Sequence, residues 1–156
     1  MPKTNKARLV EAAIQARERA VAPYSRFKVG AALLTNRREI FTGANVESAS
    51  YGLTCCAERV ALFKALTEGK KRFVALAVAA RTPKGPMPCG ACRQLLSEYA
   101  PEAVVWVADS DRPNEVAQYS VAELLPGAFL KVPASKIVVE NAPQNRKLSG
   151  RKWFRQ

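Results

Sequence analysis

The sequence predicts an α/β fold, a three-layer α/β/α sandwich built on a central mixed sheet. Segments typical of helices alternate with segments typical of strands along most of the chain. Residues 73–80 and 103–108 are almost uninterrupted apolar runs, as expected for strands that are covered on both faces. With 156 residues, 48% of them hydrophobic, the chain is long enough for one domain and too short for two of ordinary size.

The N-terminal third predicts a helix followed by a β-hairpin. Apolar residues recur at three- and four-residue spacing over residues 4–22, so we expect a helix that stops before Pro23. Residues 27–35 and 39–46 are rich in small, branched and aromatic side chains, as in strands, and residues 36–38 form the turn between them.

The rest of the chain alternates between helix and strand. The predicted elements are helices at 56–68, 89–99 and 121–124 and strands at 73–80 and 103–108. Gly69 ends the first of these helices, and a loop rich in proline and glycine precedes the second. Both cysteine-containing helices therefore begin directly after a loop.

Histidine is absent, and its absence excludes several kinds of active site. Ser-His-Asp catalysis, Cys-His catalysis and histidine-ligated zinc all need this residue. Any side chain that transfers a proton near neutral pH must then be a carboxylate, Lys, Tyr or Cys. The net charge of +12, from 25 Lys and Arg against 13 Asp and Glu, raises the hypothesis of a nucleic-acid partner without establishing it.

The sequence shows no signal for export or membrane insertion. No apolar run reaches about 18 residues, and the N-terminus leads into a charged amphipathic stretch instead of an apolar signal core. We therefore expect a soluble protein of the cytoplasm. In that reducing compartment, the four cysteines favour metal binding or catalysis over disulfides.

Three of the cysteines have the arrangement of a catalytic zinc site. Cys89 and Cys92 form a C-x-x-C motif after a proline, and Cys56 stands at the start of another predicted helix. Three protein ligands leave one tetrahedral position open, whereas a structural zinc normally has four. The free N–H groups and the positive dipole end of a helix start also stabilise thiolates. We therefore expect one Zn²⁺ on these three sulfurs.

Glu58 is the candidate catalytic acid and base. Residues two apart point to opposite sides of a helix, so Cys56 and Glu58 face one cavity only if they straddle its first turn. From there the carboxylate would reach a water on the zinc without ligating the ion. Zinc lowers the pKa of such a water from about 15.7 to about 7, so water is the expected nucleophile. Arg59 would donate to a ligand sulfur and offset the excess negative charge.

The order C-x-E and then P-C-x-x-C is the signature of zinc-dependent nucleobase deaminases, in the version whose first ligand is cysteine. Over roughly residues 8–130 the chain resembles the short, single-domain cytidine deaminases. The likeness extends beyond the metal-site segments. The matching segments are residues 22–27, 29–33, 45–51, 56–59, 88–94 and 124–129.

This resemblance implies hydrolysis of cytidine and 2′-deoxycytidine to uridine and deoxyuridine with release of ammonia, as in pyrimidine salvage. It implies that Phe27 stacks on the pyrimidine and that Asn45 and Glu47 hold the ribose hydroxyls. It also places Tyr51 and Ala57 among the substrate-binding residues. A flat aromatic ring suits a flat base, and amide and carboxylate groups suit sugar hydroxyls.

The resemblance further implies a homotetramer with shared active sites, in which Phe129 reaches into the site of a neighbouring subunit. Three features depart from the usual family pattern. Cys55 replaces an aliphatic residue, the hairpin turn lacks the common glycine, and about 27 residues follow Phe129. We therefore divide the chain into a catalytic domain, 1–132, and a basic C-terminal extension, 133–156. The extension is either a solvated, partly disordered end or a nucleic-acid-binding arm.

Structural interpretations of the same residues stay open. A closed zinc site with four cysteines would need both Cys55 and Cys56 as ligands, although neighbouring side chains diverge. Without a metal role, Cys55 fills space at the helix start. Glu58 alone could serve only to stabilise a helix N-terminus. The remaining candidates could be core aromatics, a turn residue and a solvated charge: Phe27, Tyr51, Asn45 and Glu47.

Three other functions compete with nucleoside deamination. They are deamination of RNA or DNA, deamination of a nucleoside antibiotic such as blasticidin S, and binding of RNA by a zinc-stabilised module. Glu47 argues against a polymer substrate, because a 3′-phosphodiester would meet its carboxylate in a buried pocket. The pair Asn45 and Glu47 favours ordinary nucleosides. A binding module predicts metal without ammonia release and salt-dependent RNA affinity.

Overall fold

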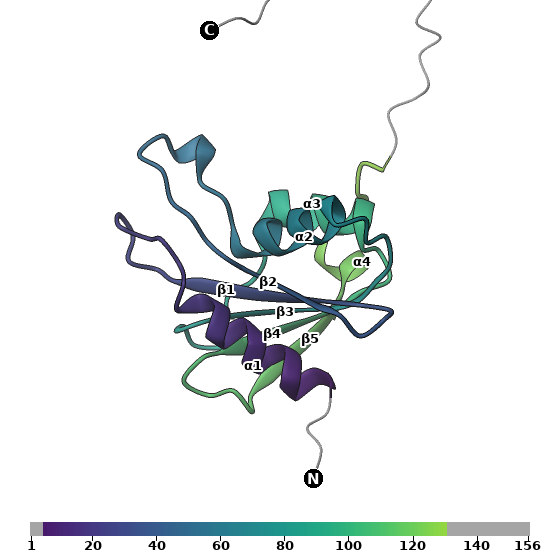
Figure 1. Ribbon diagram of the computed structural model, residues 1–156, viewed down its shortest axis with the longest axis horizontal. Helices are drawn as coiled ribbons and strands as arrows, with labels where there is room; N and C mark the ends of the chain where they lie inside the picture. The colour runs from purple at the N-terminus through teal and green to yellow at the C-terminus, as the bar shows by residue number, and fades with distance from the viewer. Residues whose placement is uncertain (1–4, 131–156) are drawn as a thin grey trace, which may run out of the picture.

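A five-stranded mixed sheet forms the centre of the computed structural model, which describes residues 5–130 (Figure 1). The strand order is β2-β1-β3-β4-β5; β3 and β4 are parallel, and all other neighbours are antiparallel. The strands are β1 (Val29–Thr35), β2 (Ile40–Ala44), β3 (Phe73–Ala80), β4 (Val104–Asp109) and β5 (Val116–Ser120). The predicted α/β class with a mixed sheet is confirmed.

Helices cover both faces of this sheet (Figure 1). Helix α1 (Asn5–Arg17) covers one face, while α2 (Ala57–Thr67), α3 (Gly90–Tyr99) and α4 (Val121–Leu124) lie on the other. A short 3₁₀ helix, η1 (Tyr51–Leu53), lies in the loop between β2 and α2. Alternate residues of the strands serve the two cores: Ala32 and Leu34 pack on the α1 side, and Ala31 and Leu33 on the other. The predicted three-layer sandwich is therefore confirmed.

Helices α2 and α3 begin at the same edge of the sheet. Strands β2, β3 and β4 run in one direction, because β1 is antiparallel to both β2 and β3. The register pairs Gly30 with Ala44 and Val29 with Ala80, so the C-terminal ends of β2 and β3 meet at this edge. The segments that leave these two ends lead into α2 and α3. Such an edge is the usual place for ligands in α/β sheets.

Two glycines let the helical layers approach the sheet closely. A Cβ at Gly43 of β2 would lie 2.4 Å from the carbonyl oxygen of Ala57 and 2.5 Å from the nitrogen of Ala61. A Cβ at Gly30 of β1 would lie 2.0 Å from the carbonyl oxygen of Ala13 in α1. No side chain fits at either position, so the first turn of α2 rests directly on the backbone of β2.

The first helix ends five residues earlier than predicted, at Arg17 instead of Ala22. The chain leaves the helix through a turn, and Val21 then forms a parallel bridge with Val46. The amide of Val21 donates to the carbonyl of Asn45 (2.9 Å), and the amide of Glu47 donates to the carbonyl of Val21 (2.8 Å). These long-range backbone bonds outweigh the local preference for helix, and the sequence pattern carries no sign of them.

Strand β5 was absent from the sequence prediction. It is an edge strand whose residues are exposed or partly exposed, and it runs directly into α4 at Ser120 without a turn residue between them. A short edge strand without a buried face lacks the apolar alternation that would reveal it. The other strands and helices match their predicted segments to within two residues at most ends. In the hairpin turn, Arg38 takes the left-handed conformation (φ 66°) that glycine adopts more readily.

Among residues 5–130, no helix combines the length and the apolar character that crossing a bilayer requires. The predicted extension, 133–156, lies outside the described residues.

Replacement of Gly43 by alanine should lower the free energy of unfolding by about 1–3 kcal/mol, the usual cost of overpacking. The added methyl group would meet backbone atoms of α2, which cannot rotate away. Chemical denaturation measures the change. Gly52→Ala is the matched control, since a Cβ there meets nothing within 4 Å. Equal stability of the two variants would contradict the close packing of α2 on β2.

Candidate metal centre and active site

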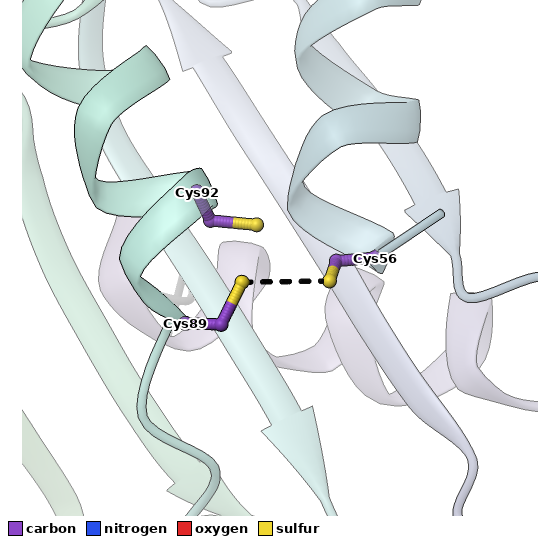
Figure 2. Close-up of side chains that lie close together, drawn as sticks. All are labelled: Cys56, Cys89 and Cys92. Atoms are coloured by element: carbon purple, nitrogen blue, oxygen red, sulfur yellow. Dashed lines mark hydrogen bonds between the residues drawn. The ribbon is translucent and has the colours of Figure 1, made fainter. Parts of the chain in front are cut away.

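Three cysteine sulfurs converge between the N-termini of α2 and α3 (Figure 2). Cys56 is the N-cap residue of α2, Cys89 is the N-cap residue of α3, and Cys92 lies in the first turn of α3. Their Sγ atoms all lie within 4.8 Å of one another, and those of Cys56 and Cys89 are 3.7 Å apart. Residues that are 33 and 36 positions apart in the sequence thus form one cluster.

The spacing of these sulfurs fits a tetrahedral zinc ion. Zn–S bonds of about 2.3 Å at tetrahedral angles place neighbouring sulfurs about 3.8 Å apart. The Cys56–Cys89 distance of 3.7 Å agrees with this value. Cys55 does not belong to the cluster; its backbone pairs with Val46 in an antiparallel bridge instead. Among residues 5–130 the cluster therefore offers three protein ligands, and a zinc ion held by them would keep a fourth coordination position for a reactant.

The surroundings of Cys56 favour its thiolate. Hydrogen bonds from the thiols of Cys92 and Cys89 and from Arg59 lower the pKa of Cys56 to about 5, with Cys92 making the largest contribution. The same contact, together with burial, raises the pKa of Cys92. Cys56 therefore loses its proton before Cys92, and a bound divalent cation would stabilise the thiolate of Cys92.

Arg59 supports the cysteine cluster from one side. Its Nη2 donates to the carbonyl oxygen of Thr54 (2.6 Å) and lies 3.9 Å from the Sγ of Cys56. The first bond fixes the guanidinium against the loop before α2, and the second brings its positive charge to a ligand sulfur. Arg59 therefore lies where it could offset the negative charge of the thiolates, as expected from the sequence.

Glu58 is a buried carboxyl group beside the cluster. It lies in the first turn of α2 and is 6% exposed. Burial raises its pKa to about 7, and the negative charge of Cys56 adds to the shift. Glu58 lines a cavity of about 210 Å³ together with Cys56 and Cys89. A carboxyl group with this pKa can both take up and release a proton at neutral pH.

The same cavity contains three of the predicted substrate-binding residues: Phe27, Asn45 and Ala57. Asn45 is buried, and its Oδ1 accepts from the amide of Val29 (2.8 Å) while its Nδ2 donates to the carbonyl of Phe27 (2.9 Å). Asn45 therefore holds the backbone that presents Phe27 to the cavity. One N–H and one lone pair of its amide stay available for a ligand.

Glu47 and Tyr51 line a neighbouring cavity of about 390 Å³. The carboxylate of Glu47 accepts from the amides of Tyr24 (2.9 Å) and Ser25 (3.1 Å) and from the hydroxyl of Ser25. These hydrogen bonds lower the pKa of Glu47 and keep its carboxylate ionised; the bond from the Ser25 hydroxyl makes the largest contribution. Glu47 is partly exposed, however, so its repulsion of a 3′-phosphate is weaker than in the buried pocket assumed from the sequence.

Phe129 lines neither of these two cavities. Its side chain is 65% exposed, and its carbonyl oxygen accepts from the Nε2 of Gln94 (2.5 Å). Within one chain, the structure therefore does not bring Phe129 to the cysteine cluster.

Sequence reasoning did not single out several residues that line the cavities, and Thr54 and Met87 are two of them. Thr54 lines both cavities and so joins the two, while Met87 lines the cavity that contains Glu58. Met87 stands two residues before Cys89, and Thr54 two residues before Cys56. Proximity to the cysteines was the only signal that could have identified them, because neither has side-chain chemistry that singles it out.

Known deaminases match this chain. The family model for the cytidine and deoxycytidylate deaminase zinc-binding region matches residues 3–108. A cytidine deaminase from Halalkalibacterium halodurans is 54% identical over 78% of this chain and 91% of that protein. One from Sporosarcina psychrophila is 44% identical over 80% and 90%. The crystal structure of cytidine deaminase from Burkholderia pseudomallei matches with a TM-score of 0.75 and 50% identity, covering 78% of this chain and 97% of that one.

Replacement of Cys56 by serine should reduce zinc affinity at least tenfold, because a hydroxyl group is a poor substitute for a thiolate ligand. Zinc bound per chain after dialysis against a weak chelator measures the loss. Cys55→Ser is the matched control, since it removes the adjacent thiol, which lies outside the cluster. Loss of zinc from the control, or retention by Cys56→Ser, would contradict this ligand set.

Proposed function

The chain belongs to the cytidine and deoxycytidylate deaminase family, and from this premise we propose that it removes the 4-amino group of cytidine and 2′-deoxycytidine by hydrolysis. The observation that carries the proposal is a cluster of three cysteine sulfurs and a buried carboxyl group at one cavity. The products are uridine or deoxyuridine and ammonia. The chemistry needs ligands for zinc and a group that transfers protons, and the three cysteines and the carboxyl group can supply both.

Cys56, Cys89 and Cys92 are the proposed ligands of the zinc. When bound there, zinc supplies an open coordination position and lowers the pKa of water from about 15.7 to about 7. Glu58 takes a proton from the attacking water and delivers it to ring nitrogen N3 as a C4–O bond forms. It then transfers the second proton of the water to the 4-amino group, and the C4–N bond breaks to release ammonia.

The base and the sugar occupy the two adjoining cavities in this proposal. Phe27 stacks on the pyrimidine in the cavity of Glu58, where the first turn of α2 at Ala57 offers backbone N–H groups without helical partners. Asn45 and Glu47 bind the ribose hydroxyls, and Tyr51 closes the second cavity. Thr54 lines both cavities, so in this proposal it lies where the base is joined to the sugar.

We further propose a homotetramer with shared active sites. Phe129 lines neither of these two cavities of its own chain, yet it is large, apolar and 65% exposed. Tyr51 is 82% exposed on the loop that carries η1, and this loop projects from the body of the protein (Figure 1). Exposed apolar side chains on a projecting loop favour contact with another chain. The tetramer would bring Phe129 of one chain to the cavity of another.

Location and domain division are also proposals. A thiolate site with Cys55 as an additional free thiol suits a reducing compartment, so we propose that the enzyme acts in the cytoplasm, in pyrimidine salvage. Residues 1–132 form the catalytic domain, and residues 133–156 form a basic extension of unassigned role.

Replacement of Glu58 by glutamine should lower kcat/KM for cytidine by about 10²–10⁴-fold, the usual contribution of a positioned acid and base. The amide keeps the shape of the side chain but cannot carry the proton, so zinc content should stay equal to that of the parent. Ultraviolet absorbance follows the loss of cytidine. Glu68→Gln, at the exposed C-terminal end of the same helix, is the matched control and should keep full activity.

Other outcomes of this assay would favour the rival functions. A parental rate for Glu58→Gln would remove Glu58 from the mechanism. A faster reaction with blasticidin S than with cytidine would indicate an antibiotic deaminase, and undiminished turnover of a 3′-linked cytidine would indicate a polymer substrate. Zinc and salt-dependent RNA binding without any release of ammonia would indicate a binding module.

Shared active sites predict that two impaired variants restore each other. Phe129→Ala should have reduced activity, and mixing it with Glu58→Gln under conditions that exchange subunits should raise the activity above the sum of the two. The Phe129→Ala chain supplies an intact Glu58, and its neighbour supplies an intact Phe129. Sedimentation should report 68 kDa, four times the chain mass of 17.0 kDa. Additive activities, or an active monomer, would contradict sharing.

A further inference from the structure

Met87 lines the cavity of Glu58 and has no part in the chemistry above. It belongs to the loop between β3 and α3, two residues before Cys89, and it is 44% exposed. The other apolar side chains around this cavity include Phe27 and Val78. Met87 is thus an apolar side chain at the rim of a site where a flat base is expected to enter.

The backbone before Met87 is held against strand β4. Gly85 has a φ of 77°, and its amide donates to the carbonyl of Thr82 (2.9 Å). A Cβ at Gly85 would lie 2.7 Å from backbone atoms of Ala108. The loop therefore crosses the end of β4 at van der Waals contact, in a conformation that favours glycine.

The backbone after Met87 is held just as firmly. Pro88 is fully buried, and its carbonyl oxygen accepts from the Nε of Arg93 (2.7 Å). The Nη1 of Arg93 donates to the carbonyl oxygen of Leu124 at the end of α4 (3.0 Å). Because the chain is fixed on both sides, the position of Met87 beside the cavity is set by the fold.

The proposed chemistry orients the base with respect to Met87. Ring atom C4 must lie at the cysteine cluster, and N3 must face Glu58, which comes from α2. In a pyrimidine ring, N3 and C5 flank C4 on opposite sides. The C5 edge therefore points away from Glu58, toward other parts of the cavity lining, which include Met87 and Cys89 from the segment before α3.

We propose that Met87 forms the wall against the C5 edge of the pyrimidine and determines how large a C5 substituent the site admits. This inference rests on the proposed deamination of cytidine and assigns a specificity-determining residue to it. The substrate class in question is cytidines that carry a methyl group or a similar substituent at C5. The thioether is unbranched and flexible, so it adapts to a small substituent but still occupies the space.

Steady-state kinetics with cytidine and 5-methylcytidine tests the assignment. Met87→Ala opens the wall and should raise the ratio of kcat/KM for 5-methylcytidine to that for cytidine about tenfold, whereas Met87→Phe should lower it about tenfold, as expected for one small group in an apolar pocket. Equilibrium binding of 5-methyluridine and uridine should show the same preferences without turnover. Val74→Ala, 42% exposed near the opposite end of β3, is the matched control and should leave both ratios unchanged.

The outcomes separate this inference from the function on which it rests. If the parent protein releases no ammonia from cytidine, the proposed function fails and the assignment of Met87 fails with it. If the parent and both Met87 variants deaminate cytidine but the two ratios stay within twofold of the parental values, only the assignment of Met87 is overturned. A change in the kinetic ratio without a change in the binding ratio also overturns it, because a contact wall must affect binding.

Discussion

The site depends on the close approach of two helix N-termini over one edge of the sheet. Cys56 begins α2, and Cys89 begins α3, so the three sulfurs meet only if both helices start at the same place. Gly43 allows α2 to rest directly on β2, and the parallel pair β3 and β4 carries α3 across the same face. At these helix starts, unpaired N–H groups and positive dipole ends favour the thiolates that zinc requires.

The close approach of the two helix N-termini also determines the charge balance at the cysteine cluster and the pKa of Glu58. Three thiolates leave a divalent ion with excess negative charge, which the two helix dipoles and Arg59 offset. Glu58 shares the first turn of α2 with Ala57 and is buried beside Cys56, so its neutral form is favoured and its pKa rises to about 7. The burial of this carboxyl group therefore lets it take up and release a proton near neutral pH.

Several loops around the two cavities are held in place by hydrogen bonds from polar side chains. Asn45 fixes the backbone of Phe27 and Val29, Glu47 binds the segment at Ser25, and Arg93 anchors the loop that carries Met87. In each case a polar side chain satisfies main-chain groups of a distant segment. Loops positioned by a rigid scaffold in this way often carry binding and catalytic residues.

The sequence alone determined the fold class, the buried strand β3 and the candidates Cys56, Cys89, Cys92 and Glu58, because apolar periodicity and motif spacing are local properties. The tertiary structure decided what depends on distant partners. It ended α1 at Arg17 through the bridge between Val21 and Val46, and it added the edge strand β5. It also separated the expected pocket residues into two cavities and revealed Met87, because a pocket is formed by side chains from several elements and no single segment encodes it.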